Sequence, residues 1–160
     1  MTKVGIIGCG NISGIYLQAK EKFPILETVA CADLDMDRAK AKAEEYGIRA
    51  LTVDQLLADD EIEIIINLTI PAVHAEVAGA AVESGKHAYS EKPLGLNREE
   101  GNELLAKANA AGLRVGNAPD TFLGGGIQTC RKLIDDGWIG QPLAATAFMM
   151  APGHERWHPD

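Results

Sequence analysis

The sequence is short of cysteine, of basic residues and of long apolar runs. Its 160 residues include three cysteines, and 15 lysines and arginines stand against 23 aspartates and glutamates, for a net charge of −8. The excess of acid argues against a sequence-independent hold on nucleic acid. An odd number of widely spaced cysteines favours a reducing compartment, which we take to be the cytoplasm. No apolar run approaches the roughly 18 residues that cross a bilayer, so we expect neither a signal peptide nor a membrane span.

What the chain does contain is a glycine-rich turn near its start. The apolar run 4–7 ends in Gly8 and Gly10 and passes directly into a segment of helical composition from Ile15. The order is strand, tight turn, helix. Gly8 permits the sharp turn, and Gly10 removes the side chain that would keep the backbone away from a diphosphate. The start of the helix directs unpaired N–H groups at the phosphates.

An acidic residue follows at the spacing of a dinucleotide site. Asp33 comes 23 residues after Gly10, directly behind a second apolar run, 28–32. The ribose-binding acid of such a fold lies about 20 residues beyond the glycines. The alternative is a tight turn with a surface aspartate. One departure is that Ser13 takes the third small-residue position of G-x-G-x-x-G, with Gly14 one step later, so a hydroxymethyl group must fit between helix and strand.

The rest of the sequence alternates β-branched runs with segments of helical spacing. We expect strands at 49–51, 62–68, 86–90 and from 113, and helices at about 37–46, from 52, at 71–84, at 97–111 and at 126–136. The helix caps are predicted at Asp37, at Thr52 with Gln55, and at Asn97 with Glu100. This alternation predicts an α/β fold with a doubly wound, mostly parallel sheet, the Rossmann fold.

Two stretches near the end of the sequence need separate treatment. Residues 143–150 have the composition of a strand but no later partner in this sequence. The string His154–His158 spells H-E-x-x-H, which binds zinc when both histidines share a helical face. Pro159 biases His158 away from helical backbone angles, and no third ligand follows, so we expect no metal site.

Ligands of doubly wound sheets bind outside the carboxyl ends of the strands, so chemistry is expected there. Besides the glycine turn and Asp33, two segments qualify, Asn67–His74 and Ser90–Pro93. Within the second, Lys92 has the place of an acid–base group beside a nicotinamide, and the alternative is a surface lysine in a loop. His74 either reaches a substrate or ribose or is a satisfied structural histidine.

From Val4 onward the chain resembles the glucose-fructose oxidoreductase/inositol dehydrogenase (Gfo/Idh/MocA) family. The most specific match is Glu91-Lys92-Pro93, after the segment 81–87, and Thr69 with His74 five residues later supports it. Residues 139–142 look like the family's link into a second domain. Family members often have a proline directly after the threonine, whereas this sequence has Thr69-Ile70-Pro71, which alters the backbone path beside the cofactor.

The resemblance implies an NAD-dependent oxidoreductase acting on a sugar, polyol or related hydroxy compound. Lys92 would be the active-site lysine, and Glu91 would place it beside the nicotinamide. Residues 1–141 would form the dinucleotide-binding domain, and residues 142–160 would begin a truncated substrate and oligomerisation domain, so that this chain alone would bind NAD but lack turnover. The predicted cofactor-binding residues are Gly8, Gly10, Asn11, Ile12, Asp33, Leu68, Thr69, Pro71, His74 and Glu91.

The residues that follow the second predicted strand bear on the choice between NAD and NADP. The Asp33 carboxylate would accept hydrogen bonds from ribose hydroxyls and repel a 2′-phosphate, and Leu34 offers no cation in compensation, although Arg38 lies within reach. NAD is therefore expected over NADP. Two other classes stay open from the sequence: a methyltransferase using S-adenosylmethionine, and a non-enzymatic domain that senses NAD(H). Membranes and nucleic acids are not expected partners, and the full-length form would be a homo-oligomer.

Overall fold

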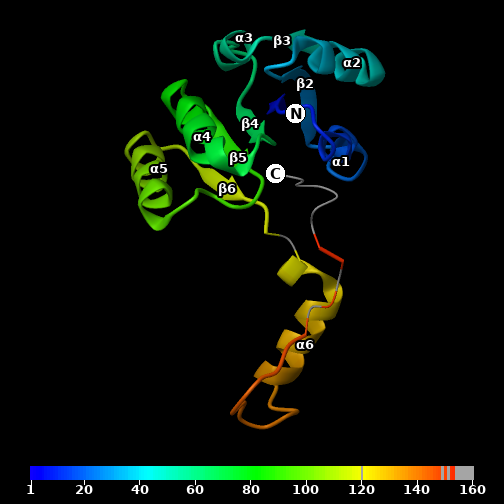
Figure 1. The fold of residues 1–160 in the computed structure, drawn as a ribbon, viewed down its shortest axis with the longest axis vertical. Coiled ribbons are helices and arrows are strands. Elements are labelled where there is room, and N and C mark those ends of the chain that lie inside the picture. Colours follow the sequence, from blue (N-terminus) through cyan, green and yellow to red (C-terminus); the bar gives the residue numbers. More distant parts are fainter. Residues whose placement is uncertain (120, 149, 151, 154–160) are drawn as a thin grey trace. The chain divides into compact units, whose positions relative to one another are not determined.

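The computed structural model describes residues 1–119, 121–148, 150 and 152–153. The chain divides into two compact units, Met1–Pro119 and Asp120–Asp160. Figure 1 shows the first unit as strands flanked by helices, and shows α6 as the main element of the second. The predicted boundary at residues 141 and 142 stays a prediction.

The elements of the first unit alternate along the chain, with η marking a 3-10 helix. They are β1 (Thr2–Ile7), α1 (Ser13–Leu17), η1 (Ala19–Glu21), β2 (Leu26–Ala32), α2 (Met36–Tyr46), β3 (Arg49–Leu51), α3 (Val53–Leu57), β4 (Ile64–Asn67), η2 (Pro71–Val73), α4 (His74–Glu83), β5 (His87–Ser90), α5 (Arg98–Ala110) and β6 (Val115–Asn117). The second unit holds η3 (Thr121–Leu123) and α6 (Gly125–Asp135).

The six strands form one sheet in the order β3-β2-β1-β4-β5-β6, and every pairing is parallel. The chain therefore winds outward from β1 in one direction and then, from β4, in the other. This is the strand order of the Rossmann fold, and the crevice between β1 and β4 is its ligand-binding switch point. The predicted fold class is confirmed.

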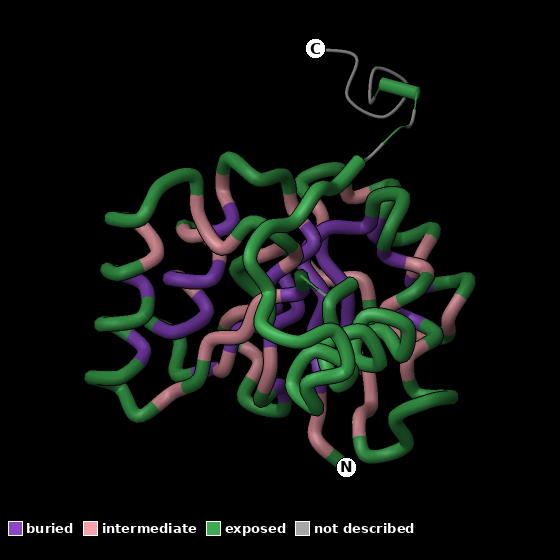
Figure 2. The backbone as a smooth tube through the Cα atoms, turned by 90° about the horizontal axis from the view of Figure 1, so that it is seen from below, coloured by how far each residue is buried: buried purple, intermediate pink, exposed green. Residues whose placement is uncertain are grey.

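Two apolar layers cover the two faces of this sheet, because neighbouring residues of a strand point to opposite faces. Ile7 packs with residues of α3, α4 and α5, whereas Ile6 packs with residues of α1 and α2. In β4 the same alternation sends Ile65 to the first layer and Ile66 to the second. Figure 2 shows the buried positions gathered in the middle of the first unit.

The helix ends mostly match their sequence signals. The capping box of Thr52 and Gln55 is present, Asn97 caps α5, and Gly47 ends α2 in the left-handed region at φ 66°. The predicted cap Asp37 is wrong. Asp35 caps α2 instead, because its backbone is still extended and its carboxylate accepts from the N–H groups of Asp37 and Arg38. Asp37 lies inside the first turn.

In the second unit, α6 ends before Gly137, which has a φ of 79°. The segment with the composition of a strand, 143–150, forms no helix or strand at the residues described there, 143–148 and Met150. A strand needs a neighbouring edge to bond to, and the described part of this unit contains no other strand. None of the helices in the described part of the chain is long and apolar enough to cross a membrane.

Candidate functional site

A cavity of about 660 Å³ opens at the carboxyl ends of β1, β2 and β4. Five of the residues predicted for cofactor binding line it together: Gly8, Gly10, Asp33, Leu68 and Thr69. The remaining lining comes mainly from the starts of α2, α3 and α4: Ile7, Leu34, Asp35, Arg38, Val53, Asp54, Ile70, Val73, Glu76 and Val77. The site therefore lies at the switch point of the sheet.

The two glycines of the turn serve different purposes. Gly8 has a φ of 104°, and a Cβ added there would lie 2.6 Å from the carbonyl carbon and oxygen of Leu68. Any side chain at this position would collide with the backbone that follows β4. A Cβ added at Gly10 would meet nothing within 4 Å. Gly8 thus allows the turn after β1 to pack against the Leu68 backbone, whereas Gly10 leaves open space in the lining of the cavity.

Ser13 fits between helix and strand because its hydroxyl has a partner. The side chain is fully buried, and Oγ donates to the Gly10 carbonyl oxygen at 2.7 Å. The Ser13 N–H donates to the same oxygen at 3.1 Å. The third small position of the glycine pattern therefore accepts a serine, which fastens the start of α1 to the turn.

Asp33 is held rigidly beside the glycine turn. Its Oδ2 accepts from the Cys9 N–H at 2.8 Å, and its Oδ1 accepts from the Asp35 N–H at 2.9 Å. The Cys9 thiol adds no charge here, because a hydrogen bond with the Cys31 thiol and burial raise the pKa of Cys9. Arg38 pairs with Asp35 at 3.3 Å, and Leu34 is 97% exposed. The cavity rim at β2 is therefore acidic.

A buried polar network joins the ends of β4 and β5. Asn67, His74 and Ser90 are each at most 1% exposed. The Asn67 amide donates to the His74 carbonyl oxygen at 3.0 Å and to Ser90 Oγ at 3.2 Å. Its Oδ1 accepts from the Thr69 N–H at 3.2 Å and the Thr69 hydroxyl at 2.6 Å. Among the described residues every buried side-chain polar atom has a partner, so this network is complete.

His74 bridges the two loops that follow β4 and β5. Its Nδ1 lies 2.6 Å from the Pro93 carbonyl oxygen, and its Nε2 lies 3.0 Å from the Thr69 carbonyl oxygen. His74 is 1% exposed and both ring nitrogens face carbonyl oxygens; a neutral imidazole carries one N–H and so donates to one of them at a time. Direct contact between His74 and a cofactor stays a prediction.

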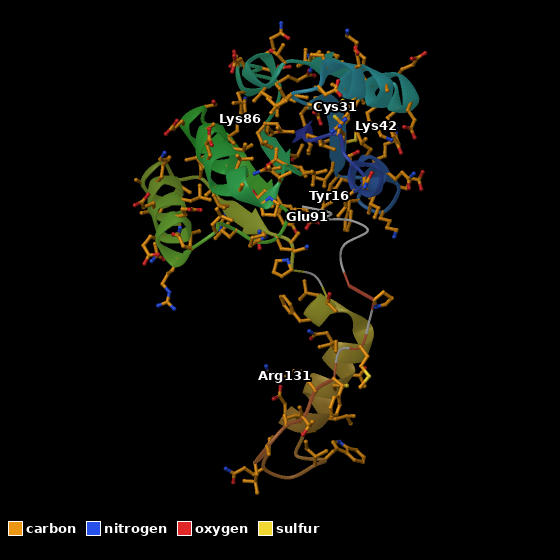
Figure 3. All side chains as sticks on the ribbon, viewed as in Figure 1. Tyr16, Cys31, Lys42, Lys86, Glu91 and Arg131 are labelled. Atoms are coloured by element: carbon orange, nitrogen blue, oxygen red, sulfur yellow. The ribbon has the colours of Figure 1, made fainter. Side chains whose placement is uncertain are left out.

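The Glu91-Lys92-Pro93 loop is fixed by bonds from several elements. The Glu91 N–H donates to the Asn67 carbonyl oxygen at 2.9 Å, and the Asn117 amide donates to the Glu91 carbonyl oxygen at 2.8 Å. Tyr16 donates its hydroxyl proton to Glu91 Oε1 at 2.7 Å, and both side chains are labelled in Figure 3. Within the described residues, the exposed Lys92 ammonium makes no hydrogen bond or ion pair. The loop is fixed while its lysine head group is available.

None of the other predicted site residues lines the cavity: His74, Glu91 and Lys92 have the contacts given above, and three more lie close to the cavity along the chain. Asn11 and Ile12 are exposed in the turn before α1, and Pro71 begins η2. Their contact with a cofactor stays a prediction. The sequence reasoning missed Val53 and Asp54, although both follow a strand end and the rule that selected Asp33 would have found them.

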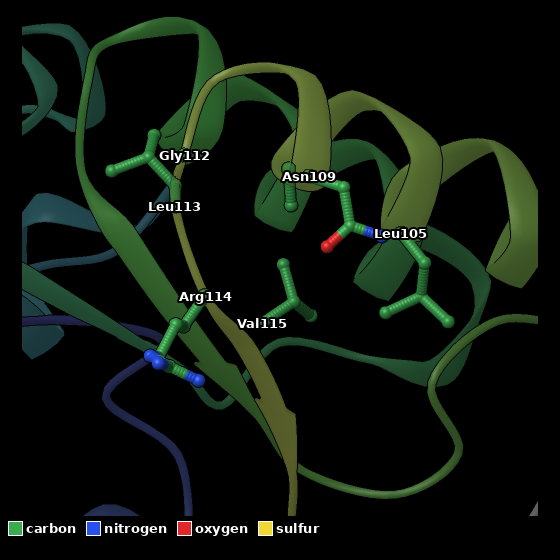
Figure 4. A pocket seen from close by; sticks show the side chains of 7 residues that line it. Leu105, Asn109, Gly112, Leu113, Arg114 and Val115 are labelled. Carbon is green, nitrogen blue, oxygen red and sulfur yellow. The ribbon is translucent and has the colours of Figure 1, made fainter.

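A separate hollow of about 400 Å³ lies between α5 and the residues that lead into β6 (Figure 4). Leu105, Asn109 and Arg114 are among its lining residues. It lies at the amino end of β6, whereas the ligand sites of this fold lie at the carboxyl ends. No group of three or more metal-ligating side chains occurs in the described part of the chain, and His154–His158 lies outside it.

An open glycine after β1 and a fixed carboxylate after β2, beside the switch point between β1 and β4, define a dinucleotide-binding Rossmann domain. Comparison with known families narrows this class. The model of the Gfo/Idh/MocA oxidoreductase family, NAD-binding Rossmann fold, matches residues 2–118, and the chain belongs to that family. Methyltransferases are a different family, so that alternative is set aside.

Individual relatives agree with this assignment. The chain is 29% identical over 150 residues to a 1,5-anhydro-D-fructose reductase of Ensifer adhaerens, covering 92% of this chain and 45% of the relative. It is 29% identical over 154 residues to an inositol 2-dehydrogenase/D-chiro-inositol 3-dehydrogenase of Lactiplantibacillus plantarum, covering 89% and 42%. The structure of KijD10, a 3-ketoreductase of Actinomadura kijaniata in complex with NADP and TDP-benzene, superimposes with a TM-score of 0.77 at 32% identity, covering 85% and 42%. The chain spans less than half the length of these relatives.

Proposed function

We propose that this chain is the nucleotide-binding domain of an NAD-dependent oxidoreductase that acts on a hydroxyl-bearing carbon of a sugar, polyol or related compound. The observation that supports this most is the Glu91-Lys92-Pro93 loop. The loop follows β5, the neighbour of β4, whose carboxyl end borders the cavity. Its backbone is hydrogen-bonded to Asn67 and Asn117, whereas the Lys92 ammonium has no partner among the described residues. A lysine held in this way suits proton exchange with a substrate hydroxyl.

The cavity residues fit a dinucleotide. Gly10 lines the cavity, and a Cβ added there meets nothing within 4 Å, so the turn leaves room for a diphosphate. We assign the diphosphate to the turn that contains Gly8, Gly10, Asn11 and Ile12, and the adenosine ribose to Asp33. Leu68, Thr69 and Pro71 would flank the nicotinamide half. When bound, NAD supplies a hydride acceptor; the protein binds and orients it.

We assign NAD over NADP as the preferred cofactor. Both oxygens of the Asp33 carboxylate are fixed by backbone N–H groups, so the charge cannot swing away from a 2′-phosphate. Arg38, the nearest cation along the chain, is paired with Asp35. The relative KijD10 was solved with NADP, so binding measurements on this chain must decide the preference.

In the proposed reaction the uncharged amine form of Lys92 takes the hydroxyl proton when the alcohol is oxidised, and the ammonium so formed returns a proton when the carbonyl is reduced. Glu91 orients the lysine through the Lys92 N–H, which donates to Glu91 Oε2 at 3.0 Å. His74 acts as a brace: it contacts the carbonyl oxygens of Thr69 and Pro93 and so holds the two loops at a fixed separation. The substrate class rests on the names of the relatives, an anhydrofructose reductase and inositol dehydrogenases.

The test is Lys92→Ala in an active form of the enzyme that contains this domain, screened with NAD against sugars and polyols. We expect kcat to fall by roughly 10² or more, with much less change in NAD affinity. Lys22→Ala, an exposed lysine outside the cavity, is the matched control and should behave as the parent. Unchanged turnover in Lys92→Ala would refute the catalytic assignment. NAD binding without turnover on any compound of the panel, the same in the parent and in Lys92→Ala, would instead favour an NAD(H)-sensing domain.

A further inference from the structure

Tyr16 lies on α1, the helix that directly follows the glycine turn, and bonds to a residue 75 positions away in the lysine loop. Its hydroxyl donates to Glu91 Oε1 at 2.7 Å, and Figure 3 labels both residues. Because the acceptor is a carboxylate, this hydrogen bond is of the stronger, charge-assisted kind. It joins the loop assigned to the diphosphate to the loop assigned to proton transfer.

The Glu91 carboxylate is shared between two donors. While Oε1 accepts from Tyr16, Oε2 accepts from the N–H of Lys92, at 3.0 Å. Removing one donor frees the carboxylate to rotate, and rotation weakens its hold on the peptide group that carries the Lys92 side chain. The orientation of Lys92 is therefore set partly by a residue on α1.

The other end of this chain of contacts lies at the glycine turn. The hydroxyl of Ser13, the first residue of α1, donates to the Gly10 carbonyl oxygen at 2.7 Å, and Tyr16 comes one helical turn later. A displacement of the Gly10 backbone is thus passed to α1 and through Tyr16 to Glu91. The route crosses from one half of the sheet to the other, since β1 and β5 are separated by β4.

We propose that Tyr16 is a positioning residue that couples occupancy of the diphosphate loop to the placement of Lys92. It touches neither substrate nor cofactor and acts through Glu91. The proposal rests on the proposed function, because that function identifies the ligand of the glycine turn and the role of Lys92. It adds that the glycine turn and the Glu91-Lys92-Pro93 loop respond together when a ligand binds at the glycine turn.

The test uses ADP, which carries the adenosine and diphosphate but neither the second ribose nor the nicotinamide, so it cannot reach Lys92 directly. Amide NMR spectra of the ¹⁵N-labelled chain are recorded during an ADP titration. In the parent chain we expect the Gly10 and Lys92 amide signals to shift together with one dissociation constant. In Tyr16→Phe the Gly10 signal should still shift with a similar constant, and the Lys92 response should disappear.

Tyr46→Phe is the matched control. The Tyr46 hydroxyl also faces α1, accepting from Gln18 Nε2 at 3.4 Å, but makes no bond to Glu91. This variant should reproduce the parent response at both signals. If Tyr16→Phe does not give a folded spectrum, Glu91→Gln serves in its place, because it removes the shared charge and should also weaken the Lys92 response.

Two results would overturn the coupling. One is a Lys92 response to ADP in Tyr16→Phe equal to that of the parent; the other is a parent chain in which Gly10 responds and Lys92 does not. A parent chain whose Gly10 signal ignores ADP would instead refute the proposed function, and the coupling with it. In an active form of the enzyme, Tyr16→Phe should lower kcat by about tenfold with little change in the KM for NAD.

Discussion

Replacing the two glycines of the turn one at a time separates folding from binding. In Gly8→Ala the new methyl group would lie 2.6 Å from the Leu68 backbone, in a residue with a φ of 104°. The left-handed backbone costs about 1–2 kcal/mol and the overpacking about 1–3 kcal/mol, so we expect a loss of about 2–5 kcal/mol in the free energy of unfolding. For a chain of this size that lowers Tm by about 6–15 °C.

Gly10→Ala should behave in the opposite way. Gly10 is not among the glycines with positive φ, and an added Cβ meets nothing within 4 Å, so the fold should tolerate it. Its methyl group would occupy the space assigned to the diphosphate, and the Kd for NAD should rise by at least about tenfold, or 1.4 kcal/mol. Calorimetric titration with NAD and a thermal melt of each variant provide the readouts.

Gly47→Ala is the control for the cost of a left-handed backbone without overpacking, because Gly47 has a φ of 66° but open space around its Cβ position. It should lower Tm by less than Gly8→Ala and leave NAD binding unchanged. A Tm of Gly8→Ala equal to that of the parent would contradict the role of Gly8 in the fold, and a Kd of Gly10→Ala for NAD equal to that of the parent would contradict the role of Gly10 in binding.

Two further predictions concern the cavity and its supports. Asp33→Asn keeps the side-chain shape and removes the charge. In calorimetric titrations the ratio of the Kd for NADP to the Kd for NAD should fall by at least about tenfold. An unchanged ratio would count against Asp33 as the group that discriminates between the two cofactors. In His74→Phe the carbonyl oxygens of Thr69 and Pro93 lose their contacts with the ring. Because a neutral imidazole has one N–H, we count one lost hydrogen bond, at about 1–3 kcal/mol; Tm should fall by about 3–10 °C, and a melt equal to that of the parent would disprove the brace.

The fold was predictable because local signals agree with one another. The glycine turn, the alternation of strands and helices, and the caps at Thr52 and Asn97 all indicate the same doubly wound sheet. The cap of α2 was assigned two residues late, because Asp35 and Asp37 are both acidic and only the backbone angles of Asp35 identify the cap.

The site was predictable only where a sequence motif marks it. Gly8, Gly10 and Asp33 follow strand ends at recognisable spacings and line one cavity. The pairing of Tyr16 with Glu91 was not predictable, because residues 75 positions apart meet only through the order of the strands. The double contact of His74 likewise depends on the separation of two loops that follow different strands.

We expect these 160 residues to form a dinucleotide-binding domain that is catalytically incomplete alone. Titration calorimetry of the purified chain with NAD, followed by an absorbance assay at the NADH band across a sugar and polyol panel, tests it most directly. Saturable binding at one site per chain and no reduction of NAD are expected. Absence of NAD binding, or NAD reduction that disappears in Lys92→Ala, would contradict it.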